Sequence, residues 1–138
     1  MKIYVSGSIY GGTQKIDTYK VLIEALEKYG EVVDKQIADP NTIANEVYQS
    51  DEEIYEGLEE QLISADIVFA EVSVPSLGVG YELGFADKSH KNIIAIYDEG
   101  YTPKVSTMIR GNKRIKLIPY KDINEIVQNL DELLQVNK

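Results

Sequence analysis

Short apolar segments alternate along this chain with segments whose apolar residues recur at helical spacing, and this alternation limits the possible folds more than any other feature. The apolar segments are rich in β-branched side chains, which is typical of buried strands; they lie at 3–5, 31–33, 66–72, 92–97 and 115–119. The intervening segments predict helices over 15–29, 51–64, 80–89 and 123–136. Strands that alternate with helices pair in parallel through crossovers, so we expect an open parallel α/β sheet with helices on both faces.

We expect one domain over residues 1–138, because no linker, internal repeat or low-complexity segment interrupts the 138 residues. Residues 38–45 contain turn-forming side chains without a clear period, and we predict a surface loop there. The polar segment 98–113 is interpreted as a lid or a subunit contact. Ligands of an open parallel sheet lie beyond the carboxyl ends of the strands, so the loops after 3–5 and 66–72 are expected to converge on one crevice.

The composition excludes several classes of function. The chain has no cysteine and one histidine, His90, which excludes disulfides, thiolate ligands and a zinc site built from several histidines. His90 follows a predicted helix and is interpreted as an exposed cap residue without a role. The net charge of -9 argues against a nucleic acid polymer as partner. No apolar run suits a signal peptide or a membrane span, so we expect a cytoplasmic protein with no membrane partner.

The segment Pro75–Gly84 carries the strongest chemical signal in the chain. It follows the predicted strand at 66–72, and its glycines let the backbone approach a ligand closely. A helix that begins near Val79 places Glu82 in its first turn, where the helix dipole favours the ionised carboxylate by about 0.3–1 kcal/mol. Glutamates on helix surfaces are ordinary, but one beside a glycine loop at a strand end is a candidate nucleophile or base.

The loop after the first predicted strand, Gly7–Gly12, is a candidate anion site. It is neither the dinucleotide fingerprint nor a P-loop, because its third glycine is misplaced and no Lys-Ser or Lys-Thr follows. Its backbone amides and the Ser8 hydroxyl precede a predicted helix, which suits a phosphate. A plain strand-to-helix turn has the same pattern.

Two further groups of charged residues stay open to more than one interpretation. Glu71, at the end of the strand at 66–72, is a ligand group, a loop contact or a solvent-facing side chain. Arg110, Lys113 and Arg114 form the dense basic cluster of an acidic chain, which indicates either an anion-facing rim or a balanced surface.

Four segments together resemble the nucleoside 2-deoxyribosyltransferase superfamily, and within it the 2'-deoxynucleoside 5'-monophosphate N-glycosidases. They are Gly7–Gly12, Ala65–Val72, Pro75–Gly84 and Ser106–Gly111, and the likeness extends over nearly the whole chain. The resemblance implies a Rossmann-like, flavodoxin-like open sheet of about five parallel strands, a homodimer, and no metal or organic cofactor. It also implies that Glu82 attacks the anomeric carbon of a deoxyribose, stabilising the oxocarbenium-like centre and trapping it as a glycosyl ester.

The resemblance further implies where the substrate binds. Tyr4 would lie near the sugar and the catalytic glutamate, and Ser106 would reach the neighbouring site across the dimer. Ser76 with Gly78 would contact the phosphate, and serines at such positions favour a nucleoside monophosphate over a free nucleoside. The implied substrate-binding residues are Gly7, Ser8, Ile9, Tyr10, Gly11, Gly12, Tyr19, Gln36, Ser76, Gly78, Ser106 and Met108.

The chain departs from the family pattern at three positions. Tyr10 stands where the glycosidases carry an arginine, which removes one cationic contact to the substrate, and Gln36 stands where some members carry a histidine that faces the base. Leu58 stands where the family has an aspartate, and leucine cannot transfer a proton. Glu56, Glu59 or Glu60 would replace that aspartate only if the helix were shifted or the side chain reached inward, because neighbouring helix residues point in different directions.

These features lead to one expected function and to alternatives. We expect an enzyme that hydrolyses the N-glycosidic bond of a (deoxy)nucleoside 5'-monophosphate, giving free base and sugar 5-phosphate. Base exchange between deoxynucleosides and ribonucleotide cleavage of the cytidine-monophosphate N-glycosidase kind would use the same glutamate. A nucleotide-binding protein with weak or no turnover is the alternative that Leu58 favours.

Overall fold

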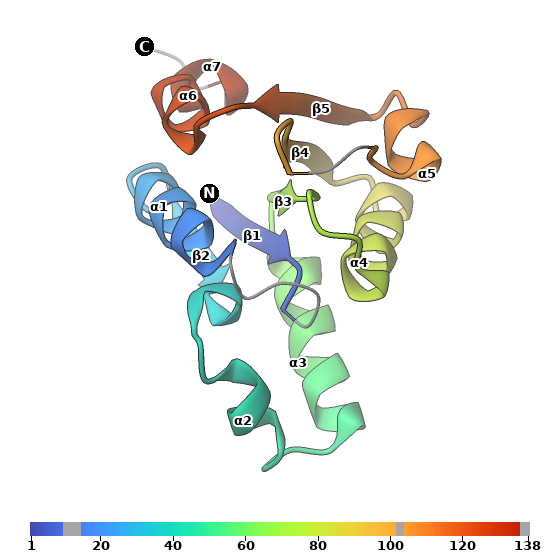
Figure 1. Cartoon of the computed structure of the whole chain (residues 1–138). Coiled ribbons are helices and arrows are strands. Elements are labelled where there is room, and N and C mark those ends of the chain that lie inside the picture. The colour runs from blue at the N-terminus through green and yellow to red at the C-terminus, as the bar shows by residue number, and fades with distance from the viewer. Residues whose placement is uncertain (10–14, 102–103, 136–138) are drawn as a thin grey trace.

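The fold is an open parallel sheet covered by helices, as the sequence predicts (Figure 1). The computed structural model describes residues 1–9, 15–101 and 104–135. In these residues the strand order is β2-β1-β3-β4-β5 and every pairing is parallel. The strands are β1 (Lys2–Gly7), β2 (Glu31–Asp34), β3 (Ile67–Glu71), β4 (Asn92–Asp98) and β5 (Ile115–Tyr120). The helices are α1 (Ile16–Leu26), the 3₁₀ helix η2 (Gln36–Ala38), α2 (Thr42–Glu46), α3 (Asp51–Ser64), α4 (Leu77–Lys88), α5 (Thr107–Arg110), α6 (Ile123–Gln128) and α7 (Leu130–Leu133).

Both faces of the sheet are buried, because side chains alternate along each strand and each face packs on its own helices. In β3, Phe69 joins the core cluster formed with α1, α6 and α7, whereas its neighbour Val68 joins the cluster formed with α3 and α4. Figure 1 shows α1 and α6 on one side of the sheet and α3 and α4 on the other. Tyr4 of β1 belongs to the face that α3 and α4 cover.

The strand order brings two carboxyl ends together at the centre of the sheet. β1 pairs with β2 on one side and with β3 on the other, so successive crossovers leave β1 in opposite directions. Such a switch point is where open α/β sheets bind ligands. Gly7 is paired with Glu71 at this edge, so the loops after β1 and β3 start side by side, as the sequence predicts.

A register shift in β2 changes which side chains face the site. Ile3 pairs with Val32, but the next residue of β1, Tyr4, pairs with Asp34, so Val33 is an additional residue in β2. A bulge of this kind redirects the side chains that follow it. Val33 packs against the core cluster that contains Tyr4, and Asp34 is aligned with Tyr4 itself.

Several predicted boundaries were wrong. Residues 38–45 are not a plain loop, because η2 and α2 occupy much of this stretch and the side chain of Thr42 is buried, its hydroxyl donating to the Gln36 carbonyl at 2.6 Å. The helix α3 has the predicted bounds, and Ser50 and Glu53 form a capping box at its start. The C-terminal helix divides at Asn129 into α6 and α7.

Candidate active site

Glu82 lies in the second turn of α4, because the helix begins at Leu77 rather than near Val79. Ser76 causes this earlier start, since its hydroxyl accepts a hydrogen bond from the Val79 amide at 3.3 Å and caps the helix. The prediction that Glu82 lies in the first turn was therefore wrong, and the dipole acts weakly at its position. The largest influence on the Glu82 carboxyl is instead its burial, which raises its pKa above the ordinary value of 4.5.

Two hydroxyl groups of β1 face the Glu82 carboxylate. Hydrogen bonding from Ser6 and from Tyr4 lowers the pKa of Glu82, in opposition to burial. Ser6 Oγ is buried and has no partner of standard hydrogen-bond geometry among the described residues, so its interaction with Glu82 is a loose one. Tyr4 is 2% exposed, and burial followed by the charge of Glu82 raises the pKa of its phenol, which keeps Tyr4 a neutral donor.

Asp34 is a third member of this group, and sequence reasoning missed it. It is 7% exposed at the carboxyl end of β2, and burial raises the pKa of its carboxyl. Its negative charge also raises the pKa of Glu82 and of Tyr4, so the three side chains form one electrostatic unit. An aspartate that ends an apolar strand was the available signal, but the bulge that turns Asp34 toward Tyr4 has no signature in the sequence.

The predicted phosphate and subunit contacts lie along a separate groove between α4 and α5, of about 1450 Å³. Ser76, Ser106 and Met108 line it, whereas Glu82 and Tyr4 do not. Ser106 is an exposed N-cap of α5 whose hydroxyl accepts from the Met108 amide at 3.3 Å. Gly78 lies in the first turn of α4 beside Ser76. The N-terminal part of α4 thus connects the groove with the Glu82 group.

Tyr19 of α1 packs against the described part of the first glycine loop. The hydroxyl of this buried tyrosine donates to the Ser8 carbonyl at 3.0 Å. Its ring lies so close to Gly7 that a Cβ atom there would be 2.9 Å from Tyr19 Cζ, which explains the glycine. Ser8 is buried and Ile9 is half-buried. Tyr19 therefore shapes the loop through its backbone, and a direct contact with substrate stays a prediction.

The remaining predicted pocket residues fall in two groups. Tyr10, Gly11 and Gly12 lie outside the described residues. Gln36 begins η2 with an exposed side chain, and its backbone amide donates to Asp34 Oδ1 at 2.9 Å. The structure thus connects Gln36 to the Glu82 group through Asp34.

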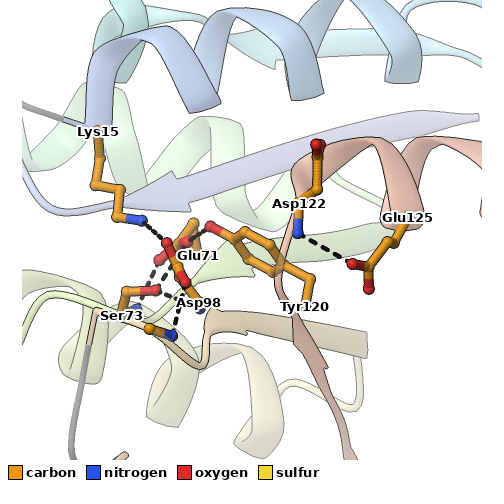
Figure 2. A network of polar contacts seen from close by, with 8 residues as sticks. Lys15, Glu71, Ser73, Asp98, Tyr120, Asp122 and Glu125 are labelled. Atoms are coloured by element: carbon orange, nitrogen blue, oxygen red, sulfur yellow. Dashed lines mark hydrogen bonds and ion pairs between the residues drawn. The ribbon is translucent and has the colours of Figure 1, made fainter.

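Glu71 belongs to a buried polar network at the carboxyl ends of β3, β4 and β5 (Figure 2). Its carboxylate accepts from the Ser73 amide at 2.6 Å, from the Ser73 hydroxyl at 2.9 Å and from the Tyr120 hydroxyl. Ser73 Oγ accepts in turn from the Asp98 amide at 2.7 Å, and Lys15 Nζ donates to Asp98 Oδ2 at 2.9 Å. Of the three interpretations of Glu71, the structure supports a loop contact, and the solvent-facing one was wrong.

Helix α3 offers no carboxyl group in place of Leu58, which is half-buried. Glu56 and Glu60 are exposed, and Glu59 accepts a hydrogen bond from the Tyr55 hydroxyl. None of these glutamates shifts the pKa of Glu82. Helix α3 therefore contributes no carboxyl group to the Glu82 group.

The basic cluster is largely engaged within the protein. Arg114 forms a bidentate pair with Asp87, at 2.6 Å and 2.8 Å. Arg110 donates through Nε to the Val105 carbonyl at 2.8 Å. These contacts favour the balanced-surface interpretation for both arginines. His90 is exposed just after α4 and adopts a positive φ of 59°, in keeping with a cap position.

No cluster of three or more histidine, cysteine or acidic side chains suited to a metal ion occurs in the described parts of the chain. Over the same residues, no helix has the length and apolar character required to cross a membrane. Among the described residues, the group at the switch point thus consists of carboxyl and hydroxyl side chains.

Comparisons with known proteins agree with this architecture. A family model described as nucleoside 2-deoxyribosyltransferase matches residues 3–117. The 5-hydroxymethyl-dUMP N-hydrolase of Esox lucius is 35% identical over 128 residues, which cover 91% of this chain and 88% of that protein. A protein of Nematostella vectensis that carries the name of a 2'-deoxynucleoside 5'-phosphate N-hydrolase is 37% identical over 135 residues, 93% of this chain and 92% of its own.

A solved structure has a similar fold over nearly the whole chain. The Clostridium botulinum CMP N-glycosidase superposes with a TM-score of 0.69, covering 96% of this chain and 99% of the other, at 21% identity. At that identity the match concerns the fold alone. The family model and the two relatives, by contrast, match in sequence over most of the chain. This chain belongs to the nucleoside 2-deoxyribosyltransferase family.

Proposed function

We propose that this protein hydrolyses the N-glycosidic bond of a 2'-deoxynucleoside 5'-monophosphate, with the cytoplasm as its expected location. The observation that supports this proposal best is the Glu82 carboxylate, which faces the Tyr4 and Ser6 hydroxyls of β1 in a chain whose relatives are named nucleotide N-hydrolases. The family model matches residues 3–117, which include Tyr4, Ser6, Asp34 and Glu82.

The proposed reaction has two steps through Glu82. In the first, a carboxylate oxygen of Glu82 bonds to the anomeric carbon while the bond from that carbon to the base breaks, and the base leaves with the electron pair. In the second, water attacks the same carbon and releases Glu82, giving sugar 5-phosphate. Tyr4 and Ser6 support the negative charge of Glu82 before attack and after release, because both donate toward it.

The 5'-phosphate is proposed to bind at the N-terminus of α4. The hydroxyl of Ser76 and the first backbone amides of this helix lie one turn before Glu82, and helix N-termini favour anions. This geometry separates the phosphate from the anomeric carbon along a single helix. Such a site would favour monophosphates over free nucleosides as substrates.

A panel of substrates tests the proposal. The protein is incubated with ribo- and deoxynucleoside monophosphates and with free nucleosides, with and without a second free base, and products are followed by chromatography. Base release from deoxynucleoside monophosphates without exchange is the expected result. Base exchange would instead support a transferase, cleavage of ribonucleotides a CMP N-glycosidase activity, and tight binding without product a nucleotide-binding protein.

We expect kcat/KM to fall on the acid side at a pH above 4.5. The nucleophile must be ionised, and burial raises the pKa of Glu82 above that ordinary value, so protonation inactivates the enzyme earlier than for an exposed glutamate. Tyr4→Phe removes a donor that lowers this pKa and should move the acid limb to still higher pH. Exposed Tyr48→Phe is the control. An acid limb at or below pH 4.5, or one unmoved by Tyr4→Phe, would contradict this assignment.

We further propose that two copies of the chain form a homodimer through the groove between α4 and α5. Three large apolar side chains there are strongly exposed: Leu77 at 97%, Tyr81 at 63% and Met108 at 83%. Exposed apolar patches of this kind mark protein interfaces. A homodimer would cover them and bring Ser106 toward the neighbouring site.

Leu77→Glu is expected to convert the dimer to a monomer, because it places a charge in the proposed interface. Val47→Glu is the matched control, since Val47 is 75% exposed but lies after α2, away from the groove. Sedimentation equilibrium of the two variants and the wild type measures the mass. A monomeric wild type, or a dimer that survives Leu77→Glu unchanged, would argue against this interface.

A further inference from the structure

Neither of the two residues that the resemblance makes catalytic, Glu82 and Tyr4, is suited to give a proton to the departing base. A nucleobase leaves far more easily when a ring atom is protonated as the glycosidic bond breaks, and general acids contribute about 10²–10⁴-fold to such steps. Tyr4 is poorly suited to this, because burial raises the pKa of its phenol. Leu58 and its neighbours on α3 supply no buried carboxyl group.

Three carboxyl groups among the described residues are buried to below a tenth exposure, and two are fully engaged. Glu71 accepts three hydrogen bonds from Ser73 and Tyr120. Asp87 is paired with Arg114, which lowers its pKa to about 2 and keeps it ionised. Asp34 is the third. Its one donor in the described part of the chain is the Gln36 amide, on Oδ1, and no cation in this part lowers its pKa.

The position of Asp34 suits a proton donor to the substrate that Glu82 would attack. The bulge at Val33 aligns Asp34 with Tyr4, whose hydroxyl faces Glu82, so the two carboxyl groups approach one site from β2 and from α4. Burial raises the pKa of both carboxyl groups, but Glu82 faces two hydroxyl donors and Asp34 only one backbone amide, so the ionised form is better stabilised at Glu82 than at Asp34. Pairs of carboxyl groups whose environments differ in this way divide the roles of acid and nucleophile.

We propose that Asp34 is the proton donor to the leaving base, an inference that rests on the proposed N-glycosidase function. As the bond between the anomeric carbon and the base breaks, the base takes its electron pair and the proton of Asp34, while Glu82 forms the glycosyl ester. Asp34, now ionised, accepts a proton from the water that attacks the anomeric carbon. Release of Glu82 then restores both groups, and the balance is nucleotide plus water to base plus sugar 5-phosphate.

The test compares Asp34→Asn on two kinds of substrate. On the best deoxynucleoside monophosphate, the single-turnover rate of base release should fall about 10²–10⁴-fold. On 4-nitrophenyl deoxyribose 5-phosphate, whose leaving group needs no proton, the single-turnover rate of 4-nitrophenol release should fall less than about tenfold. A structural defect would lower both rates equally, and equal losses, or no loss, would overturn the inference. Asparagine keeps the acceptor for the Gln36 amide, so the fold is expected to persist.

Asp39→Asn is the matched control, because Asp39 Oδ1 accepts from the Asn41 amide at 2.8 Å in the same local arrangement but is exposed. It should leave both rates unchanged. Glu82→Gln should abolish both, whereas a wild-type protein inactive on every substrate would overturn the proposed function and this inference together.

The wild-type pH profile gives a second readout that needs no variant. Activity on the nucleotide should fall on the alkaline side as Asp34 ionises, and this limb should be absent with the nitrophenyl substrate. The titratable groups that face Asp34 are Tyr4 of β1 and Glu82 of α4; no charged side chain in the described parts of α1, α3 or η2 shifts its pKa. An alkaline limb shared by both substrates would overturn the assignment to Asp34.

Discussion

Replacing Glu82 with glutamine is expected to lower kcat by on the order of 10⁴-fold or more, because a carboxamide cannot form the glycosyl ester. The substitution keeps the size of the side chain and its position on α4. It also removes the charge whose burial raises the pKa of this group, so the fold should not be weakened. Base release from a deoxynucleoside monophosphate, followed by chromatography under single-turnover conditions, measures the effect.

Glu60→Gln is the control for this substitution, since Glu60 is exposed on α3 and should leave kcat unchanged. Rapid acid quenching of the wild type, followed by mass spectrometry, should detect a sugar phosphate attached to the peptide that contains Glu82. If Glu82→Gln retains wild-type turnover, Glu82 is not the nucleophile. Loss of activity without any trapped adduct would leave Glu82 essential and argue against a long-lived ester.

Replacing Tyr19 with alanine is expected to destabilise the protein by about 3–5 kcal/mol, the range for removing a large buried aromatic side chain. Tyr19 is 1% exposed and packs in the core cluster between α1 and β1. Its ring also contacts Gly7 closely, so its loss leaves a cavity directly beneath the first loop. Chemical denaturation followed by circular dichroism measures the change in the free energy of unfolding.

Tyr19→Phe separates packing from the hydroxyl group. This substitution removes the hydrogen bond to the Ser8 carbonyl and should cost about 1 kcal/mol. Tyr48→Ala, at a side chain that is 87% exposed, should change stability by less than about 0.5 kcal/mol. If Tyr19→Phe raises KM strongly with no loss of stability, Tyr19 contacts substrate directly, and the structural role assigned here is wrong.

The positions of the strands could be predicted from the sequence. Strands that are buried on both faces consist mostly of apolar residues, so each appears in the sequence as a short apolar run. Val68 and Phe69 are adjacent and both fully buried, in different core clusters, which is typical of a central strand in a parallel sheet covered on both faces. The helix over α3 was predictable from its period. Its N-cap was not, because Ser50 and Asp51 are both good caps and the reciprocal bonds between Ser50 and Glu53 decide between them.

The site was predictable in part. Glu82 and Tyr4 were predicted as parts of one site from the residues and the resemblance, and their side chains lie close enough to interact; their roles in catalysis stay predictions. The environment of Glu82 was not found, because it depends on where α4 begins and on which side chains exclude water. Asp34 was missed because strict alternation along β2 would direct it to the same face as Val32, and a bulge is a tertiary adjustment between two strands.

The sequence by itself determined the parallel α/β architecture, the family and the identity of the carboxylate proposed as nucleophile, because periodicity and local motifs are properties of neighbouring residues. Only the tertiary structure decided which groups surround that carboxylate. Asp34, Tyr4 and Glu82 lie far apart in the chain, and their pKa values depend on burial and on charges that meet only when β2, β1 and α4 pack together. The register of two strands, which no local pattern encodes, places Asp34 in the site.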